Sequence, residues 1–325
     1  MSEYSAAFDW ARRSVDEGRL PTAVLGIATA DGTVALDAFG ATGSRVAGVD
    51  DAYRLFSITK PLVGIVAARA IERGLLTPET PLSAALPAFG AERDDIVRLR
   101  NLASHTSGIP EPPLDAAQGL REPLLSPGRD FVAGTVSRYS SIAFEGIAAM
   151  IEHATRSSWE TGLQALARDI DADGFTLDEA SAPHQITDAV AAGVDMENFA
   201  RLRHPGAGAI GRAGDLLALG SALLRNDGSV VAPATLAMML RPLTGDIPRL
   251  EPYPAERGQD WGFTWNLRTR APGLIDRDVF GHGGWAGTEF WVHPTAGLAW
   301  VLMTNQAARP GVDADELDNA VISGL

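Results

Sequence analysis

Ser57 and Lys60 have the residue types and the spacing of a nucleophile and its proton acceptor. Lys60 is the only lysine among the 27 basic residues of this 325-residue chain, and the other 26 are arginine. A buried lysine amine can lose its proton, whereas arginine stays protonated in proteins. Positions i and i+3 share one face of a helix, so the amine can lie within hydrogen-bond reach of the serine hydroxyl. The pair predicts an activated serine, although the same spacing also occurs where a serine only caps a helix and a lysine lies at the surface.

A helix that begins near Ser57 must position this pair. Pro61 fits only a first helical turn, where its missing N–H would have had no partner. A periodic apolar run follows from Leu62 to Ile71, and Gly74 is a typical helix stop. Ser57 is therefore predicted at a helix N-terminus, where free N–H groups and the helix dipole favour developing negative charge.

Composition excludes several other functions. A hydrophobic content of 46% with 21% charged residues is typical of a globular protein. The net charge of −14 argues against a nucleic-acid or membrane partner, and the absence of cysteine excludes thiol catalysis. The first 20 residues predict an amphipathic helix instead of a signal peptide, and no apolar run has membrane-spanning length. We expect a cytoplasmic protein of undetermined oligomeric state.

Strand patterns at both ends of the chain enclose a mostly helical middle. The prediction is therefore an α/β (α+β) protein whose antiparallel sheet, with flanking helices, is built from residues 1–56 and 226–325. Residues 57–225 form a helical insertion lobe, and the active site lies between the two parts. The predicted strands are Thr22–Ala30, Thr33–Phe39 after an Asp31-Gly32 turn, Gly262–Arg268, Glu289–Val292 and Leu298–Thr304; the predicted helices include Ile142–Ala154, Asp215–Leu224 and one from about Asp313.

Four motifs occur in an order and spacing that resembles the class C β-lactamase-like serine hydrolases. They are Ser57-Ile58-Thr59-Lys60, the segment Leu102–Gly108, the turn Tyr139-Ser140-Ser141, and Gly281-His282-Gly283-Gly284. That superfamily contains β-lactamases, D-alanyl-D-alanine carboxypeptidases and family VIII carboxylesterases. The resemblance extends from the N-terminal hairpin to Asn305 and implies a fold of the β-lactamase/DD-peptidase type, like that of penicillin-binding proteins.

The resemblance also implies roles for individual residues. Ser57 would be the acylated nucleophile, Lys60 its proton acceptor and Tyr139 a second proton-transfer group, and either Lys60 or Tyr139 could be the general base. Lys60 and His282 are the candidate cations that would lower the pKa of the phenol. The backbone N–H groups of Ser57 and Trp285 would form the oxyanion hole. Glycines at 283 and 284 would let a substrate approach the strand backbone closely.

Two departures from the family pattern bear on the substrate. Ser141 stands where the β-lactamases and peptidases of the family carry an asparagine that contacts the substrate's acylamide group. His282 and Gly283 stand where they carry a cation and a threonine that hold the substrate's carboxylate. We therefore predict a carboxylesterase for small esters, with a β-lactamase or D-alanyl-D-alanine carboxypeptidase as the alternative and a penicillin-recognising module without turnover as a weaker one. Trp285 and Trp291, with Phe290, would line an acyl pocket or belong to the core of the strand region.

Other motifs give no support for a cofactor or a metal. Residues 169–174 match the first half of a calcium-binding loop, but Ala180 occupies the position of its bidentate glutamate. His105 is predicted to be structural, with its imidazole bonded to the backbone. The chain has no GxSxG or P-loop sequence. A small-molecule ester or β-lactam is thus the only predicted partner.

Overall fold

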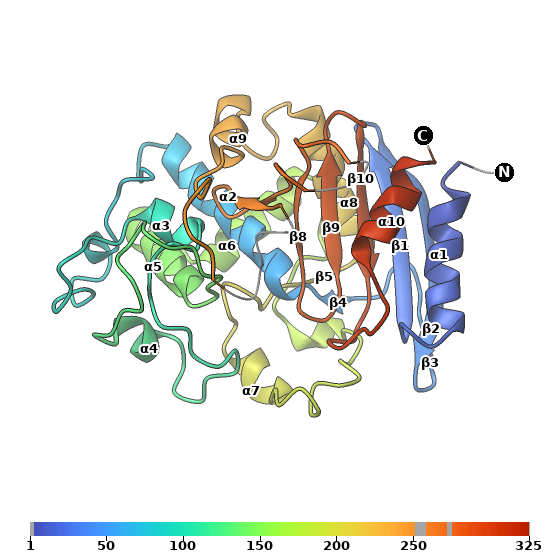
Figure 1. The fold of residues 1–325 in the computed structure, drawn as a ribbon, viewed down its shortest axis with the longest axis horizontal. Helices are drawn as coiled ribbons and strands as arrows, with labels where there is room; N and C mark the ends of the chain where they lie inside the picture. Colours follow the sequence, from blue (N-terminus) through green and yellow to red (C-terminus); the bar gives the residue numbers. More distant parts are fainter. Residues whose placement is uncertain (1–2, 251–257, 272–274, 325) are drawn as a thin grey trace.

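A sheet of eight antiparallel strands organises the residues that the structure, a computed structural model, describes: 3–250, 258–271 and 275–324. The strand order is β3-β2-β1-β10-β9-β8-β7-β6. The N-terminal and C-terminal parts of the chain both contribute strands, which confirms the predicted sheet (Figure 1). The strands are β1 (Thr22–Thr29), β2 (Gly32–Thr42), β3 (Arg45–Val46), β6 (Asp260–Trp261), β7 (Asn266–Leu267), β8 (Phe280–Gly283), β9 (Glu289–His293) and β10 (Leu298–Met303).

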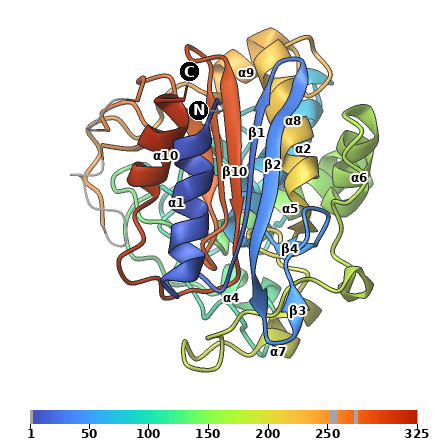
Figure 2. The same ribbon diagram turned by 90° about the vertical axis from the view of Figure 1, so that its right-hand side faces the viewer.

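Helices cover both faces of this sheet. Helices α1 (Ser5–Asp16) and α10 (Ala314–Ile322) lie side by side on one face, as Figure 2 shows, and the two ends of the described chain lie near each other. Helix α8 (Ala213–Arg225) packs on the opposite face against β1 and β10. β1 is buried along nearly its whole length because it has a helix on each side. The result is a three-layer arrangement of helix, sheet and helix.

The remaining helices form the body that adjoins the sheet. Helix α2 (Thr59–Glu72) lies at its centre and is buried on almost every side. It packs against α5 (Ala143–Thr155) and α6 (Trp159–Asp169), while α3 (Leu99–Ala103) packs on α5. The short elements are α4 (Arg121–Leu125), α7 (Met196–Arg201), α9 (Pro233–Met239) and a separate two-stranded sheet of β4 (Tyr53–Arg54) and β5 (Ile210–Gly211).

One apolar core runs through the helical body and the adjoining face of the sheet. It joins residues of α2 and α5 to Val24, Phe290 and Val301 of the strands. A second core fills the space between the other sheet face and helices α1 and α10, with Trp300 at its centre. The division into two parts, residues 1–56 with 226–325 and residues 57–225, stays a prediction. Helix α8 belongs to the part 57–225 but packs directly on the sheet.

Local sequence explains the N-terminal hairpin but not the region around Trp261. The strands β1 and β2 form the predicted hairpin, but its two turn residues are Ala30 and Asp31, one position earlier than predicted. Gly32 already pairs with Thr29 and has a φ of 128° that suits glycine. The single strand predicted over Gly262–Arg268 is wrong. Gly262 N–H donates to the Trp265 carbonyl at 2.9 Å, so the segment folds into the β6–β7 hairpin. Thr264, with φ 68°, donates its N–H to the Ala103 carbonyl, and this tertiary contact overrides the strand pattern.

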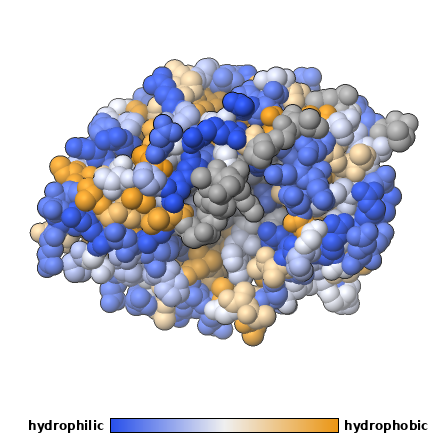
Figure 3. Space-filling view, viewed as in Figure 1, coloured by the Kyte–Doolittle hydropathy of each residue, from blue (hydrophilic) through white to orange (hydrophobic). Residues whose placement is uncertain are grey.

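The surface is mixed in polarity. Figure 3 shows mainly hydrophilic residues with apolar patches between them on the face seen in Figure 1. Among the described residues, no helix is both long and apolar enough to cross a membrane.

Candidate active site

Ser57 lies in a tight turn at the start of α2. Residues Phe56–Ile58 form one turn of 3₁₀ helix, and α2 continues from Thr59, as the sequence predicts. Phe56 has a φ of 43°, which is uncommon for a residue with a large side chain. Its ring is held between those of Phe199 and Trp285, each 5.2 Å away between centroids. Packing therefore stabilises a strained backbone directly before the serine, a feature that is frequent at functional sites.

The amine of Lys60 is buried and has three polar partners. Nζ donates to Ser57 Oγ at 3.1 Å, to Ser141 Oγ at 3.0 Å and to the Gly206 carbonyl at 2.8 Å. The side chain has no solvent exposure. Burial lowers the pKa of Lys60 from 10.5 to about 7, although the nearby Glu111 carboxylate partly opposes this shift. The amine can therefore both hold and release a proton near neutral pH.

The carbonyl of Gly206 is a part of the site that the sequence does not reveal. It belongs to a loop in which Gly206 N–H donates to His204 Nδ1 at 2.9 Å. Burial lowers the pKa of His204 to about 3, so its imidazole is a neutral acceptor. A Cβ atom at position 206 would lie 2.8 Å from the Ser141 carbonyl oxygen, so only glycine lets this loop approach the lysine closely.

The ring of Tyr139 lies against the amine of Lys60, in a cluster of rings. Lys60 Nζ lies 4.6 Å from the centroid of the phenol ring. The rings of His105 and Trp261 lie 4.6 and 5.5 Å from it. His105 Nδ1 accepts the N–H of Ser140 at 3.1 Å, which confirms the prediction that this imidazole is bonded to the backbone. His105 thus fixes the turn that carries Tyr139 and Ser141.

The structure places His282 differently from the prediction. The imidazole is fully buried beside Tyr139, with 6.0 Å between ring centroids, and donates from Nδ1 to the Gly283 carbonyl at 2.7 Å. Burial, aided by the charge of Lys60, lowers the pKa of His282 to about 3. A neutral ring cannot lower the pKa of the phenol as a cation would. Of the two predicted cations, Lys60 alone remains for that role, and His282 is not among the described residues that line the cavity around Ser57.

The two glycines after His282 also serve internal packing, and the expected close approach of a substrate to this backbone stays a prediction. A Cβ atom at Gly284 would lie 2.0 Å from Thr288 Oγ1 and 2.6 Å from the Leu55 carbonyl oxygen. A Cβ atom at Gly283 would lie 2.9 Å from a carboxylate oxygen of Glu289. Their missing side chains therefore let β8 and the next turn pack close to the segment that leads into Ser57.

Trp285, whose N–H is predicted to belong to the oxyanion hole, lines the same cavity as Ser57. Within the described part of the chain, its N–H has no hydrogen-bond acceptor. Its carbonyl accepts from Arg309 Nη1 at 3.3 Å, and the same nitrogen also donates to the carbonyls of Gln306 and Ala307. Arg309 thereby joins the turn of Trp285 to the segment after β10 and holds the N–H in position.

A cavity of about 680 Å³ opens beside these groups. Its walls include Ser57, Tyr139, Ser141 and Trp285, so the structure brings these four predicted residues together around one space. Trp291 and Phe290 do not line it, because they pack on opposite faces of the sheet in the two cores. Of the predicted aromatic wall, only Trp285 borders the cavity, where it is joined by Phe56, Pro112, Leu114, Val194 and several alanines.

Glu111 also lines this cavity, and sequence reasoning missed it. Its carboxylate accepts from Ser140 Oγ at 2.8 Å, from Ser141 N–H at 2.9 Å and from Ile142 N–H at 3.2 Å. These donors form the N-terminus of α5, where the helix dipole favours an anion. Burial of the Glu111 carboxyl group raises its pKa, and this effect outweighs the hydrogen bonds and the charge of Lys60, which lower it. No local pattern marks Glu111, which lies in a proline-rich loop 29 to 31 positions from its partners.

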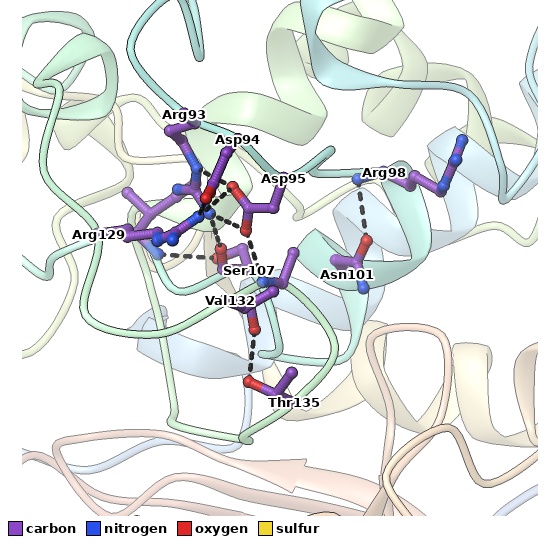
Figure 4. A network of polar contacts seen from close by, with 11 residues as sticks. Arg93, Asp94, Asp95, Arg98, Asn101, Ser107, Arg129, Val132 and Thr135 are labelled. Carbon is purple, nitrogen blue, oxygen red and sulfur yellow. Dashed lines mark hydrogen bonds and ion pairs between the residues drawn. The ribbon is translucent and has the colours of Figure 1, made fainter.

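A buried ion pair between Arg93 and Asp95 joins the loops around Ser107 and Ala133 (Figure 4). Arg93 donates to both oxygens of Asp95 at 2.7 and 2.8 Å and to the Ser107 carbonyl at 2.9 Å. Asp95 also accepts the N–H of Ala133 at 2.7 Å and pairs with Arg129. The Arg93 guanidinium holds the pKa of the Asp95 carboxyl well below its usual range. The network fixes the segment that carries His105 and, four residues beyond Ser107, Glu111.

A larger cavity of about 1070 Å³ lies apart from the predicted residues. Its lining includes Leu177, Ile186 and Met196 and several arginines, but none of the residues predicted for the site. Three of those arginines form ion pairs: Arg45 with Asp51, Arg54 with Glu179 and Arg203 with Glu160. We therefore place the candidate active site in the cavity at Ser57.

The acidic stretch at 169–174 forms ion pairs with arginines. Asp169 pairs with Arg69 at 2.7 Å, and Asp173 pairs with Arg212. The described ranges contain no group of three His, Cys, Asp or Glu residues arranged to hold a metal ion.

The helix-sheet-helix fold, with a Ser-Lys pair at the start of a buried helix, defines a protein of the β-lactamase and penicillin-binding-protein type. A family model described as Beta-lactamase matches residues 8–323, and the chain belongs to that family. It is 27% identical, over 318 aligned positions, to Esterase EstB of Burkholderia gladioli, covering 79% of this chain and 78% of that protein.

Solved structures share the fold at low sequence identity. A penicillin-binding-protein homologue from Caulobacter crescentus is 18% identical, with a TM-score of 0.82, and the match covers 100% of this chain and 98% of that one. EstCE1, described as a hydrolase with promiscuous acyltransferase activity, is 20% identical with a TM-score of 0.79 over 98% of this chain and 97% of that one.

Proposed function

We propose that the protein is a serine carboxylesterase that forms an acyl-enzyme on Ser57. The observation that carries this proposal is the hydrogen bond between Ser57 Oγ and the buried amine of Lys60, whose pKa is lowered to about 7. A neutral amine at 3.1 Å can take the hydroxyl proton as the oxygen attacks a carbonyl. An ordinary exposed lysine would hold its own proton at neutral pH and could not do so.

The proposed reaction has two half-reactions. Ser57 Oγ forms a bond to the ester carbonyl carbon while its proton passes to Lys60. The developing oxyanion accepts hydrogen bonds from the backbone N–H groups of Ser57 and Trp285. The C–O bond to the alcohol breaks, and the alcohol leaves with that proton, relayed through Tyr139. Water then attacks the acyl-enzyme, gives its proton to the same relay and releases the acid with Ser57 restored.

Three observations favour esters over β-lactams or D-alanyl peptides as substrates. Ser141 uses its hydroxyl to accept from Lys60 and offers no amide to a substrate's acylamide group. The neutral His282 is buried and supplies no cation for a carboxylate. The sequence is also similar to that of a protein named as an esterase.

The test compares two substrates with the wild type and Ser57→Ala. Rapid hydrolysis of 4-nitrophenyl butyrate that requires Ser57, with slow hydrolysis of a chromogenic cephalosporin, is the expected result. Faster hydrolysis of the cephalosporin would favour the β-lactamase alternative. Where neither substrate turns over, intact-protein mass spectrometry decides: a persistent adduct on Ser57 indicates a stalled acyl-enzyme, and its absence refutes the nucleophile.

A further inference from the structure

The charges around the cavity are unevenly distributed. The described lining of the Ser57 cavity contains two carboxylates, Glu111 and Asp188, and no arginine, lysine or histidine. Both oxygens of Asp188 accept backbone N–H groups, from Ala307 and Ala308, each at 2.8 Å. The wall of the cavity therefore presents carboxylates and no cation, although Lys60 interacts with Glu111 and Arg309 with Asp188 from behind the wall.

Two cations behind the cavity wall, Lys60 and Arg309, donate to other partners. Lys60 is fully buried behind Ser57 and Ser141 and donates to both of them. Arg309 directs one guanidinium nitrogen at three carbonyl oxygens behind Trp285. Neither side chain lines the cavity, so neither can hold a substrate carboxylate without leaving these partners.

Glu111 differs from Asp188 in its exposure. The residue is exposed, although its carboxylate is fixed by the Ser140 hydroxyl and the N–H groups of Ser141 and Ile142. Both of its oxygens accept these hydrogen bonds, and the residue lines the cavity. Glu111 accepts the N–H of Ser141, whose hydroxyl accepts from the same Lys60 amine as the Ser57 hydroxyl, and both Glu111 and Ser57 line the cavity.

We infer that Glu111 determines substrate charge: it excludes esters whose acyl group carries a carboxylate and favours neutral or ammonium-bearing acyl groups. The inference rests on the proposed esterase function of Ser57. Two like charges repel more strongly in a partly enclosed cavity than in water, because fewer water molecules screen them. A cationic acyl group gains the corresponding attraction. The role is one of specificity, distinct from the proton relay of Lys60 and Tyr139.

The experiment uses three 4-nitrophenyl esters with six-carbon acyl chains. The hexanoate is neutral, the hemiadipate carries a carboxylate, and the 6-(trimethylammonio)hexanoate carries a permanent cation. For the wild type, we expect kcat/KM for the hemiadipate to be lower than for the hexanoate by at least about tenfold, the ratio that corresponds to ~1.4 kcal/mol. The cationic ester should react at least as fast as the neutral one.

Two variants of Glu111 and one control variant separate the effect of its charge from its role in holding the Ser140–Ile142 turn. Glu111→Gln should remove most of the discrimination between the anionic and neutral esters. Glu111→Asp keeps the charge on a shorter side chain and should retain the discrimination even if all three rates fall. Glu122→Gln removes the same charge from an exposed position in α4, outside the cavity lining, and should leave the ratios unchanged.

The inference is overturned if Glu111→Gln slows all three esters equally, since the residue would then only position the Ser140–Ile142 turn. Failure of the esterase proposal gives a different result, the absence of Ser57-dependent turnover of the neutral hexanoate. In that event, NMR titration with hexanamide, adipamate and 6-(trimethylammonio)hexanamide makes the same comparison without turnover. Weaker binding of adipamate that is lost in Glu111→Gln supports the inference, and equal affinities refute it.

Discussion

Replacing Lys60 with methionine should change how the stability of the protein depends on pH. The amine has an ordinary pKa of 10.5 in an unfolded chain and about 7 in the folded protein. Between these values the unfolded chain binds more protons than the folded one, so the free energy of unfolding must rise with pH in that window. The difference between the two pKa values corresponds to ~5 kcal/mol in the free energy of unfolding, and well below pH 7 the folded protein is destabilised by this full amount.

The measurable part lies between pH 6 and pH 9. Over this range the linkage relation gives the wild type a gain of about 2–3 kcal/mol in the free energy of unfolding relative to Lys60→Met. The variant also loses the hydrogen bonds to Ser57, Ser141 and Gly206, but that loss is a nearly constant offset and leaves the slope unaffected. The comparison of slopes therefore reports the ionisation of Lys60 together with its effect on the pKa of Glu111.

Urea unfolding followed by tryptophan fluorescence, at fixed ionic strength and several pH values, provides the assay. Arg73→Met is the matched control, since it removes an exposed cation from the end of the same helix and should give a curve parallel to that of the wild type. Parallel curves for Lys60→Met as well would show that the amine titrates as it does in water. The argument for Lys60 as a proton acceptor would then fail.

Four further predictions concern activity and packing. Lys60→Arg should lower kcat by at least ~10², because arginine cannot accept a proton, and near-normal turnover would exclude Lys60 as the base. Tyr139→Phe should slow both acylation and deacylation in stopped-flow assays with an unchanged urea midpoint; unaltered rates would remove the phenol from the relay. Wild-type kcat/KM should fall below about pH 7, because Lys60 gains its proton there. Glu111→Gln should shift this fall in the pH profile to lower pH, because it removes a charge that raises the pKa of Lys60. An unchanged pH profile in Glu111→Gln would contradict the coupling between the two residues. Gly284→Ala should destabilise the protein in thermal unfolding, because its Cβ would lie 2.6 Å from the Leu55 carbonyl oxygen, and an unchanged Tm would refute this packing argument.

Sequence patterns predict the features that depend on neighbouring residues. The hairpin of β1 and β2 follows from local turn chemistry, although its turn lies one position before the predicted Asp31-Gly32, and the start of α2 follows from Pro61 and the apolar run after it. The 3.1 Å contact between Ser57 and Lys60 follows from their i, i+3 spacing. In each case the interaction that fixes the geometry lies within a few residues of the motif.

Features that depend on distant partners could not be predicted in this way. The Gly206 carbonyl lies 146 positions from Lys60, and any residue type supplies a carbonyl, so no letter of the sequence marks it. The carboxylate of Glu111 belongs to the site only because a loop places it at the start of α5, and no local sequence pattern predicts that placement. The hairpin around Thr264 likewise depends on its bond to Ala103 in α3. Ser141 was identified only through the family resemblance, because its contact with Lys60 spans 81 positions.

The single lysine gives this protein an unusual spectroscopic simplicity. In a chain grown with ¹³C- or ¹⁵N-labelled lysine, every side-chain amine signal comes from Lys60, so no resonance assignment is needed. Its chemical shift would report directly whether that amine is protonated, in the free protein and during turnover. The other 26 basic residues are arginines, so reagents selective for lysine amines have no surface target among the side chains. The same arrangement that buries one amine beside Ser57 thus makes its protonation state observable in the intact protein.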